Sequence, residues 1–450
     1  MLVVQENRTP DNLFHALCAT QRCSTTAHQG AYDIQTGAWR DKSSGTGHVE
    51  PRRVALASGY DLGHMHDDFN LMCDEDRHAR TCRMDGAAAI GCRPESSCPP
   101  RPQFRYVDNA SEILSPYLEL ATQYGWANEM FQTNQGPSFP AHQFLFGATS
   151  APSREDDRKG VFVSENLPGT GQPDTPPDNG CMARKSARIQ LIDPNGTEST
   201  QNRIYPCLEH RTVADLLDDH GLEWRYFAPG AGNLWTAPDA ISHLCQPRKR
   251  QCTGEEWQKH LVLKPARVLD EIRHCRLAQV SWIIPSGQES DHAFLNRGLG
   301  PSWVASIVNE IGNSACRDNN GARFWNSTAI VVVWDDWGGW YDHEAPSLLR
   351  YPQGGYQYGF RVPLLFISAY TQKGYINDER LDFGSIVRFV EHNFGIRKGE
   401  LTFADARAHG DLGHFYDLAA HPRPFKTIKA PRTADFFLHD TAPLTPPDDD

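Results

Sequence analysis

Three short apolar runs in this chain lead directly into polar and acidic residues, and this pattern constrains the fold more than any other. The runs and the residues that follow them are Met1–Val4 with Glu6-Asn7, Gln279–Pro285 with Asp291-His292, and Ala329–Trp334 with Asp335-Asp336. Short β-branched runs that end at Gly or Pro are typical of buried parallel strands. In open α/β sheets, ligands bind beyond the carboxyl ends of the strands. The pattern therefore predicts an all-oxygen metal site at that edge of a sheet.

Helical patterns alternate with these runs. Apolar periodicity predicts helices over residues 113–131, 212–220, 303–312 and 385–394, one within 255–275, and one starting near His142. Further strands are expected at residues 223–227 and 361–368. Because strands and helices alternate, we expect an α/β class with a mainly parallel sheet.

The chain has 450 residues, which is long enough for one large domain with excursions. We expect a single domain over residues 1–425, with a Cys-rich excursion near 71–103, a loop excursion near 150–180 and a frayed tail at 426–450. The net charge of −12 does not favour a nucleic-acid partner. No apolar stretch reaches transmembrane length.

The cysteines indicate an oxidising compartment. There are 12 of them and none forms Cys-x-x-Cys, which argues against zinc-ribbon and thioredoxin-like motifs. The close pairs Cys18/Cys23, Cys92/Cys98 and Cys245/Cys252 suit local disulfides. We therefore expect a secreted or periplasmic protein; buried thiols in a cytosolic protein are the alternative. The sequence shows no signal peptide, and a chain that starts after the native start codon would explain both observations.

Asp335-Asp336 is the strongest candidate for a site. Two adjacent carboxylates after an apolar strand lie at its end or are costly to bury, and the nearby Gly338 and Gly339 allow close approach of a ligand. A solvated turn is the alternative. Ser138 lies in a rigid turn, residues 136–140, although a plain loop serine would look the same. Neither a Gly-x-Ser-x-Gly elbow nor a P-loop is present.

Four histidines are candidates for phosphate contacts or proton transfer: His64, His66, His292 and His343. Each alone is also compatible with an ordinary core or surface histidine. Of the four, His343 has the best context, because it follows the Asp335-Asp336 turn closely.

Several segments together resemble the bacterial phosphoesterase family, which includes phosphatidylcholine-type phospholipases C, plant non-specific phospholipases C and a group of acid phosphatases. The segments run in order along residues 1–420: Gln5–Phe14, Asp61–His64, Arg83–Gly86, Gly136–Pro140, Val280–His292, Trp334–His343, Arg361–Pro363 and Ser385–Glu391. The resemblance implies an α/β/α sandwich related to the alkaline phosphatase superfamily.

The resemblance also implies roles for individual residues. Glu6, Asn7, Asp335 and Asp336 would bind one divalent cation, with Ser138 beside it as ligand and nucleophile. His64, His292 and His343 would hold phosphate oxygens or move protons. Oxygen donors favour Ca²⁺, Mg²⁺ or Mn²⁺, whereas a histidine in the ligand set would favour Zn²⁺.

Two departures from the family pattern concern the site. Thr9-Pro10 replaces Ser-Phe, which should leave Glu6-Asn7 intact and alter the turn that follows. His142 stands where many members carry Arg, which puts the substrate contacts at that position in doubt.

The resemblance leaves three functions open. The first is a phospholipase C-like phosphodiesterase acting on a phosphate ester or phospholipid, the second an acid phosphatase, and the third an exported binding protein that has lost catalysis. Trp337, Trp340 and Tyr341 could cage a choline cation or belong to the core. The intact acidic set and Ser138 argue against the binding protein.

Overall fold

An eight-stranded sheet forms the centre of the protein in the computed structural model, which describes residues 1–25, 30–166, 179–347, 358–401, 408 and 410–445. The strands are, in spatial order, β17 (Leu261–Val262), β14 (Trp224–Phe227), β18 (Val280–Ile283), β1 (Leu2–Gln5), β19 (Ile330–Trp334), β20 (Leu364–Ile367), β10 (Gly125–Phe131) and β21 (Tyr375–Asp382). Only β20 is antiparallel to its neighbours. The prediction of a mainly parallel sheet is confirmed.

The register of the central strands aligns their carboxyl ends. Val3 of β1 lies opposite Ile283 of β18, and Gln5 lies opposite Trp334 of β19. The residues that follow these three strands therefore emerge at the same edge of the sheet. All three strands are buried throughout, which matches their near-continuous apolar sequences.

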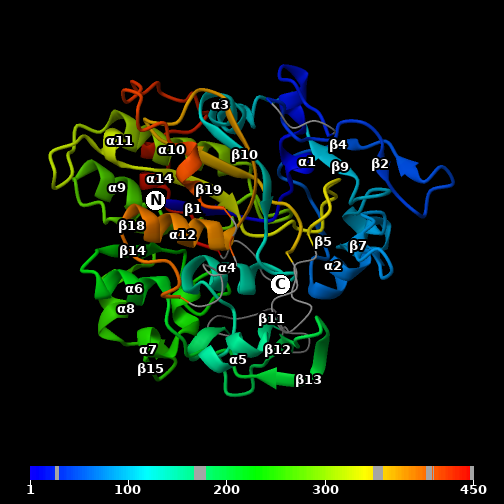
Figure 1. The fold of residues 1–450 in the computed structure, drawn as a ribbon, viewed down its shortest axis with the longest axis horizontal. Coiled ribbons are helices and arrows are strands. Elements are labelled where there is room, and N and C mark those ends of the chain that lie inside the picture. Colours follow the sequence, from blue (N-terminus) through cyan, green and yellow to red (C-terminus); the bar gives the residue numbers. More distant parts are fainter. Residues whose placement is uncertain (26–29, 167–178, 348–357, 402–407, 409, 446–450) are drawn as a thin grey trace.

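Two groups of helices pack on the sheet (Figure 1). One group contains α3 (Ser115–Gln123), α9 (Arg267–Arg273), α10 (Gly300–Asn313) and α14 (Ala434–His439). The other contains α4 (Ser138–Gly147), α6 (Val213–Asp219) and α12 (Phe383–Asn393). Figure 1 shows the strands between these groups, so the protein has the expected α/β/α layers.

The prediction of one helix over residues 113–131 is wrong for its second half. Helix α3 ends at Gln123, Tyr124 is extended, and β10 begins at Gly125. A side chain at Gly125 would collide with the ring of Phe415, since an added Cβ would lie 2.4 Å from it. The backbone N–H and C=O groups of β10 form hydrogen bonds with β20 and β21. This pairing joins residues far apart in the sequence, so helical periodicity does not reveal it.

Two expected loops contain regular structure. The tail after residue 425 includes α14, because Phe437 is buried against the ring of Trp303 with centroids 5.2 Å apart. The 150–180 excursion contains α5 (Arg154–Lys159) and β11 (Phe162–Asn166), and β11 pairs with β12 (Ile189–Ile192). Residues 167–178 of that excursion lie outside the described residues.

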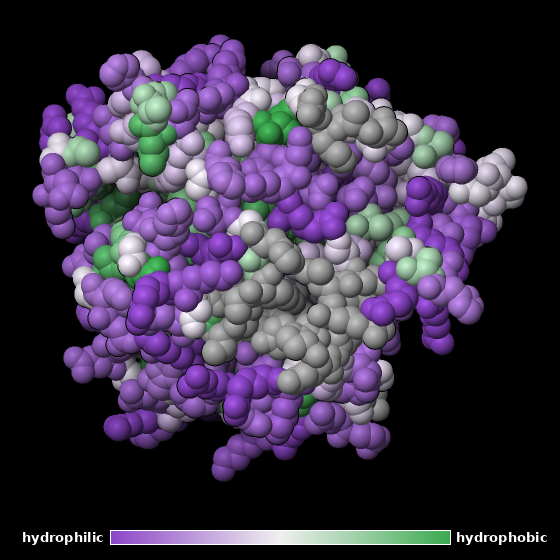
Figure 2. All heavy atoms as spheres, in the orientation of Figure 1, coloured by the Kyte–Doolittle hydropathy of each residue, from purple (hydrophilic) through white to green (hydrophobic). Residues whose placement is uncertain are grey.

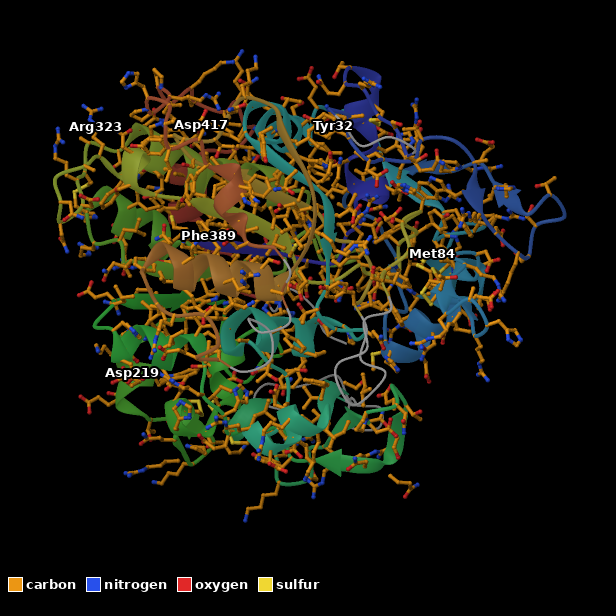
Figure 3. The ribbon with its side chains drawn as sticks, in the orientation of Figure 1. Tyr32, Met84, Asp219, Arg323, Phe389 and Asp417 are labelled. Carbon is orange, nitrogen blue, oxygen red and sulfur yellow. A yellow bond between two sulfur atoms is a disulfide. The ribbon has the colours of Figure 1, made fainter. Side chains whose placement is uncertain are left out.

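A lobe beside the sheet is built from residues 39–107 (Figure 1). It contains α2 (His66–Cys73) and two-residue strands such as β5 (Asp61–Leu62). Its hydrophobic side chains, including the buried Met84 labelled in Figure 3, form a second core with Trp337, Trp340 and Tyr341. The lobe therefore packs directly against the loop that follows β19.

Six disulfides join all twelve cysteines. They are Cys18–Cys23, Cys73–Cys82, Cys92–Cys98, Cys181–Cys207, Cys245–Cys252 and Cys275–Cys316. The three predicted local pairs are all present. Two of the six bridges, Cys73–Cys82 and Cys92–Cys98, lie within the Cys-rich excursion, among short strands and 3₁₀ turns.

The described helices include none that combines the length and the apolar character needed to span a membrane. The face seen in Figure 2 is mostly hydrophilic, with hydrophobic side chains in small separate patches.

Candidate active site

The acidic residues after β1 and β19 meet at the carboxyl edge of the sheet. The backbone nitrogen of Asn7 donates to Asp335 Oδ1 at 3.1 Å, across 328 residues of sequence. Asn7 has a φ of +60°, and Gly338 packs so closely on it that an added Cβ would lie 2.5 Å from the Asn7 carbonyl oxygen. Glycine is therefore required at position 338 for the two loops to approach each other.

The side chain of Asn7 lies between two kinds of group. One end of its amide lies 3.3 Å from Glu6 Oε2 and 3.2 Å from Asp335 Oδ1. The other end lies 3.1 Å from His64 Nε2 and 3.2 Å from His292 Nε2. With its nitrogen towards the carboxylates, the amide hydrogen-bonds at both ends. With its oxygen towards them, three oxygens converge, an arrangement that requires a cation.

Asp335 and Asp336 have different environments although they are adjacent. Burial raises the pKa of Asp335, but the nearby His142 imidazole and the polar groups of Ser138 and Glu6 outweigh it, so that the pKa lies below its usual value. Asp336 accepts from the Gly338 nitrogen at 2.6 Å and from Ser138 Oγ at 3.1 Å. Both carboxylates are fully buried, and the alternative of a solvated turn is therefore wrong.

Ser138 is the first residue of α4. The preceding turn is held by the Asn134 side chain, which donates to the Gly136 carbonyl at 2.8 Å. Pro137 has extended backbone angles and precedes the helix without capping it. The Ser138 hydroxyl is thereby held beside Asp336 at a helix N-terminus, where the helix dipole favours negative charge. The helix was expected to start near His142 and begins one turn earlier.

His142 was singled out only as a departure from the family pattern, and the structure brings it into the acidic cluster. Its Nε2 lies 3.4 Å from Glu6 Oε1 and 3.6 Å from Asp335 Oδ2. These three side chains can offer one ligand atom each within 4.8 Å of one another. The sequence could have predicted this position, because His142 follows Ser138 by four residues, a spacing that places both side chains on one face of a helix.

His64 and His292 face Asn7 from the other side. His64 Nδ1 lies 2.7 Å from the Leu62 carbonyl, and His292 Nδ1 lies 2.5 Å from the Ala293 carbonyl. Because a carbonyl only accepts, each Nδ1 carries a proton, and each Nε2 is directed at the centre of the site. The two rings are 5.9 Å apart between centroids.

His343 lies in a different cluster. Its Nδ1 is 2.8 Å from Asp11 Oδ2 and its Nε2 is 3.2 Å from Asp33 Oδ1. Burial lowers the pKa of His343, but the Asp11 and Asp33 carboxylates outweigh this and raise it to about 10. The buried Arg361 completes the cluster by pairing with Asp33 and Asp342. Both ring nitrogens of His343 are thus engaged away from Ser138.

Trp337, Trp340 and Tyr341 are fully buried and belong to the second core. Arg8 stacks on Trp340, with its guanidinium carbon 4.9 Å from the ring centroid, and donates to the Asp291 carbonyl. The core alternative for these aromatic residues is confirmed, and a choline cage built from them is not supported.

One large cavity among the described residues lies away from these groups. It has a volume of about 440 Å³ and is lined by Met1, Ala329 and Phe389, among others. Met1 and Ala329 stand at the amino ends of their strands, whereas the acidic cluster stands at the carboxyl ends. Phe389, on α12, is labelled in Figure 3.

The fold and the site define an α/β protein with a buried serine, carboxylate and histidine centre at the carboxyl edge of its sheet. The chain belongs to the Phosphoesterase family, whose model matches residues 1–397.

Curated relatives at low identity include phospholipases C. Phospholipase C B of Mycobacterium tuberculosis is 24% identical over 265 residues, covering 52% of this chain and 50% of that protein. Hemolytic phospholipase C of Pseudomonas aeruginosa is 22% identical over 340 residues, covering 67% of this chain and 41% of that protein. The chain thus spans about half the length, or less, of these relatives.

A solved structure that the chain resembles is a protein in the alkaline phosphatase superfamily from Vibrio parahaemolyticus. The two share 11% identity, with a TM-score of 0.34 and coverage of 65% of this chain and 63% of that chain.

Proposed function

We propose that this protein hydrolyses phosphate esters through a serine nucleophile and that its substrates are diesters of the phospholipase C type. The observation that carries the proposal is the position of Ser138 Oγ, which donates to Asp336 beside the Glu6–Asp335 cluster. The similarity to phospholipases C supports the diester class. The six disulfides support an exported protein.

The residues at the site fit one divalent cation. With its oxygen turned towards the carboxylates, the Asn7 amide places that oxygen 3.3 Å from Glu6 Oε2 and 3.2 Å from Asp335 Oδ1, and Asp335 Oδ2 makes no hydrogen bond among the described residues. Glu6, Asn7, Asp335, Asp336 and Ser138 would hold the ion. When bound, it supplies polarisation of the phosphoryl group and lowers the pKa of the serine hydroxyl.

Ser138 performs the first displacement in this mechanism. Its hydroxyl proton passes to Asp336 Oδ2, which already accepts it in a hydrogen bond. Oγ attacks phosphorus in line, the bond between phosphorus and the leaving oxygen breaks, and a phosphoserine remains. His292, protonated on Nε2 as well as on Nδ1, donates its Nε2 proton to the leaving alkoxide. A water molecule then gives a proton to His292 Nε2 and displaces Ser138 from phosphorus in a second in-line step, and Oγ recovers its proton from Asp336.

His64 and Asn7 bind the transferred group. Backbone carbonyls hold Nδ1 of His64 and His292, so both Nε2 atoms are directed at the centre, where in their protonated form they donate to the equatorial oxygens and stabilise their charge. His343 has no step in this mechanism, because Asp11 and Asp33 engage both of its nitrogens.

The test compares p-nitrophenylphosphorylcholine with p-nitrophenyl phosphate. We expect faster diester turnover, with a loss on the order of 10³-fold or more in Ser138→Ala and in the presence of chelator. Ser281→Ala is the matched control, because Ser281 is equally buried and its hydroxyl makes no hydrogen bond among the described residues.

Faster monoester turnover with the same losses would mean an acid phosphatase. Activity that survives Ser138→Ala would refute the nucleophile, and no activity on either ester would favour a binding protein.

Stereochemistry gives an independent check. Two successive in-line displacements retain configuration at phosphorus, so a chiral phosphate ester should give a product with net retention. Net inversion would exclude the phosphoserine.

A further inference from the structure

His142 extends an acidic cluster that otherwise offers only oxygen donors. It is 1% exposed, and its Nε2 makes no hydrogen bond among the described residues. The nearest charged atoms are Glu6 Oε1 at 3.4 Å and Asp335 Oδ2 at 3.6 Å. A buried imidazole nitrogen aimed at two carboxylates at these distances needs either a proton or a cation between them.

We propose that His142 is a ligand of the divalent cation and that it gives the site a preference for Zn²⁺ over Ca²⁺ and Mg²⁺. The inference rests on the proposed function only in requiring that a cation binds at Glu6 and Asp335. Imidazole nitrogen suits zinc and other late transition metals, whereas calcium and magnesium take oxygen ligands almost without exception.

The separations fit ligands of one small ion. Donor atoms about 2.0–2.2 Å from a tetrahedral zinc ion lie about 3.3–3.6 Å apart. The observed separations of 3.4 Å and 3.6 Å fall in this range. A charge-assisted hydrogen bond between a protonated histidine and a carboxylate is shorter, at about 2.7–2.9 Å. The geometry therefore favours a shared cation over a shared proton.

The helix explains how the nitrogen reaches the cluster. α4 begins at Ser138, and His142 lies four residues later, roughly one turn along the same face. The serine hydroxyl and the imidazole consequently approach the carboxylates from one rigid element. The residue type at position 142 thus decides whether this helix adds a nitrogen ligand or none.

Other histidine and carboxylate clusters among the described residues lack this feature. In the Asp11–Asp342–His343 cluster the Arg361 guanidinium already supplies a cation. In the Asp218–Glu256–His260 cluster both ring nitrogens of His260 have hydrogen-bond partners, the Trp224 carbonyl and Glu256. The Asp33–His343–Glu344 cluster shares His343, whose two ring nitrogens both have carboxylate partners, so none of these clusters directs an unpartnered histidine nitrogen at its carboxylates.

Metal binding can be measured without any assay of activity. The protein is stripped with chelator, and its affinity for Zn²⁺, Ca²⁺ and Mg²⁺ is measured by competition with a chromophoric chelator and by elemental analysis. Wild type should bind one zinc ion, and His142→Gln should bind it at least about 10-fold more weakly. Affinity for Ca²⁺ should change little. The matched control is His66→Gln, since His66 is also 1% exposed but both its nitrogens lie beside backbone carbonyls.

Spectroscopy identifies the ligand. Pulsed EPR of the Cu²⁺-loaded wild type and of His66→Gln should show nitrogen modulation from a coordinated imidazole, and His142→Gln should lose it. His142→Asn is the second variant, and thermal melting of the stripped proteins shows that each variant is folded.

The outcomes separate this inference from the proposed function. Zinc affinity and nitrogen modulation that persist in both His142 variants would overturn the inference, even if Ser138→Ala is inactive. Tight zinc binding through His142 in a protein whose activity survives Ser138→Ala would support the inference and refute the serine nucleophile. Absence of any bound cation in the wild type would refute both.

Discussion

Ser138 Oγ donates a hydrogen bond to Asp336 Oδ2 at 3.1 Å, although 198 residues separate them in the sequence. Ser138 begins a helix, and Asp336 follows a fully buried apolar strand of the sheet. The contact therefore depends on packing α4 against the carboxyl edge of the strands. It also gives the hydroxyl a proton acceptor and a fixed orientation, the two properties that a nucleophile needs.

Asp336→Asn should remove the acceptor with little change in shape. Asparagine is nearly isosteric, but it does not take the hydroxyl proton and it lowers the negative charge of the cluster. We expect kcat on a p-nitrophenyl ester to fall by at least about 100-fold, with a smaller effect on KM. Glu344→Gln serves as control, because Glu344 stands near the His343 cluster. An unchanged kcat in Asp336→Asn would contradict the assignment.

Arg361→Met should destabilise the protein strongly. The guanidinium is fully buried and pairs with Asp33 at 2.9 Å and Asp342 at 3.0 Å, so the change leaves buried carboxylates without their main cation. A loss of about 3–5 kcal/mol in the free energy of unfolding is expected from denaturant titration. Arg380→Met, which breaks a half-exposed pair with Glu129, should cost about 0–1 kcal/mol. Equal effects of the two changes would contradict the role of the network.

His343 should remain protonated at pH 8, and a histidine-detected NMR titration would check this. Its pKa is about 10 because the Asp11 and Asp33 carboxylates outweigh the effect of burial. The unfolded-state pKa of histidine is about 6.5. Protonated His343 therefore stabilises the folded state fully below pH 6.5, and this stabilisation is lost as the pH rises towards 10. His343→Gln should therefore lower the stability at pH 6–8. A loss of kcat as large as that of Ser138→Ala, in a variant that stays folded, would restore His343 to the catalytic set.

Asp291 should make the stability fall as the pH rises from about 4 to 6. Burial raises its pKa to about 6, with Arg8 as the main opposing charge. Because the folded state then binds the proton more tightly than the unfolded state, the stabilisation is present at low pH and is lost through this window. The difference is on the order of 3 kcal/mol. In Asp291→Asn, unfolding midpoints between pH 4 and 6 should become flatter; a slope equal to that of the wild type would refute the assignment.

Strand sequences were sufficient to predict the centre of the fold. The runs at Leu2–Gln5, Val280–Ile283 and Ile330–Trp334 are apolar enough to form strands buried on both faces, and the structure places them as neighbours. Gly125–Phe131 and Tyr375–Asp382 could not be predicted in the same way. The apolar residues of Gly125–Phe131 continue the apolar face of α3. Tyr375–Asp382 mixes polar and apolar residues because it lies at the edge of the sheet.

The residues of the candidate site could likewise be predicted only in part from the sequence. Glu6, Asn7, Asp335 and Asp336 follow strands, so the topology alone brings them together. His64 is carried in by the disulfide-rich lobe, and no local pattern predicts its approach to Asn7. His343 follows the Asp335-Asp336 turn closely in sequence, yet the neighbouring carboxylates of Asp11 and Asp33 hold it elsewhere.

The sequence by itself determined which residues stand at the carboxyl edge of the sheet, because parallel strands that run in register must end together. Only the tertiary structure decided what those residues meet there. α4 brings Ser138 and His142 to the carboxylates, while buried charges draw His343 away from them. The physical reason is that strand ends are set by local hydrophobic pattern, whereas the partner of a buried charge is set by whichever opposite charge folding brings within reach.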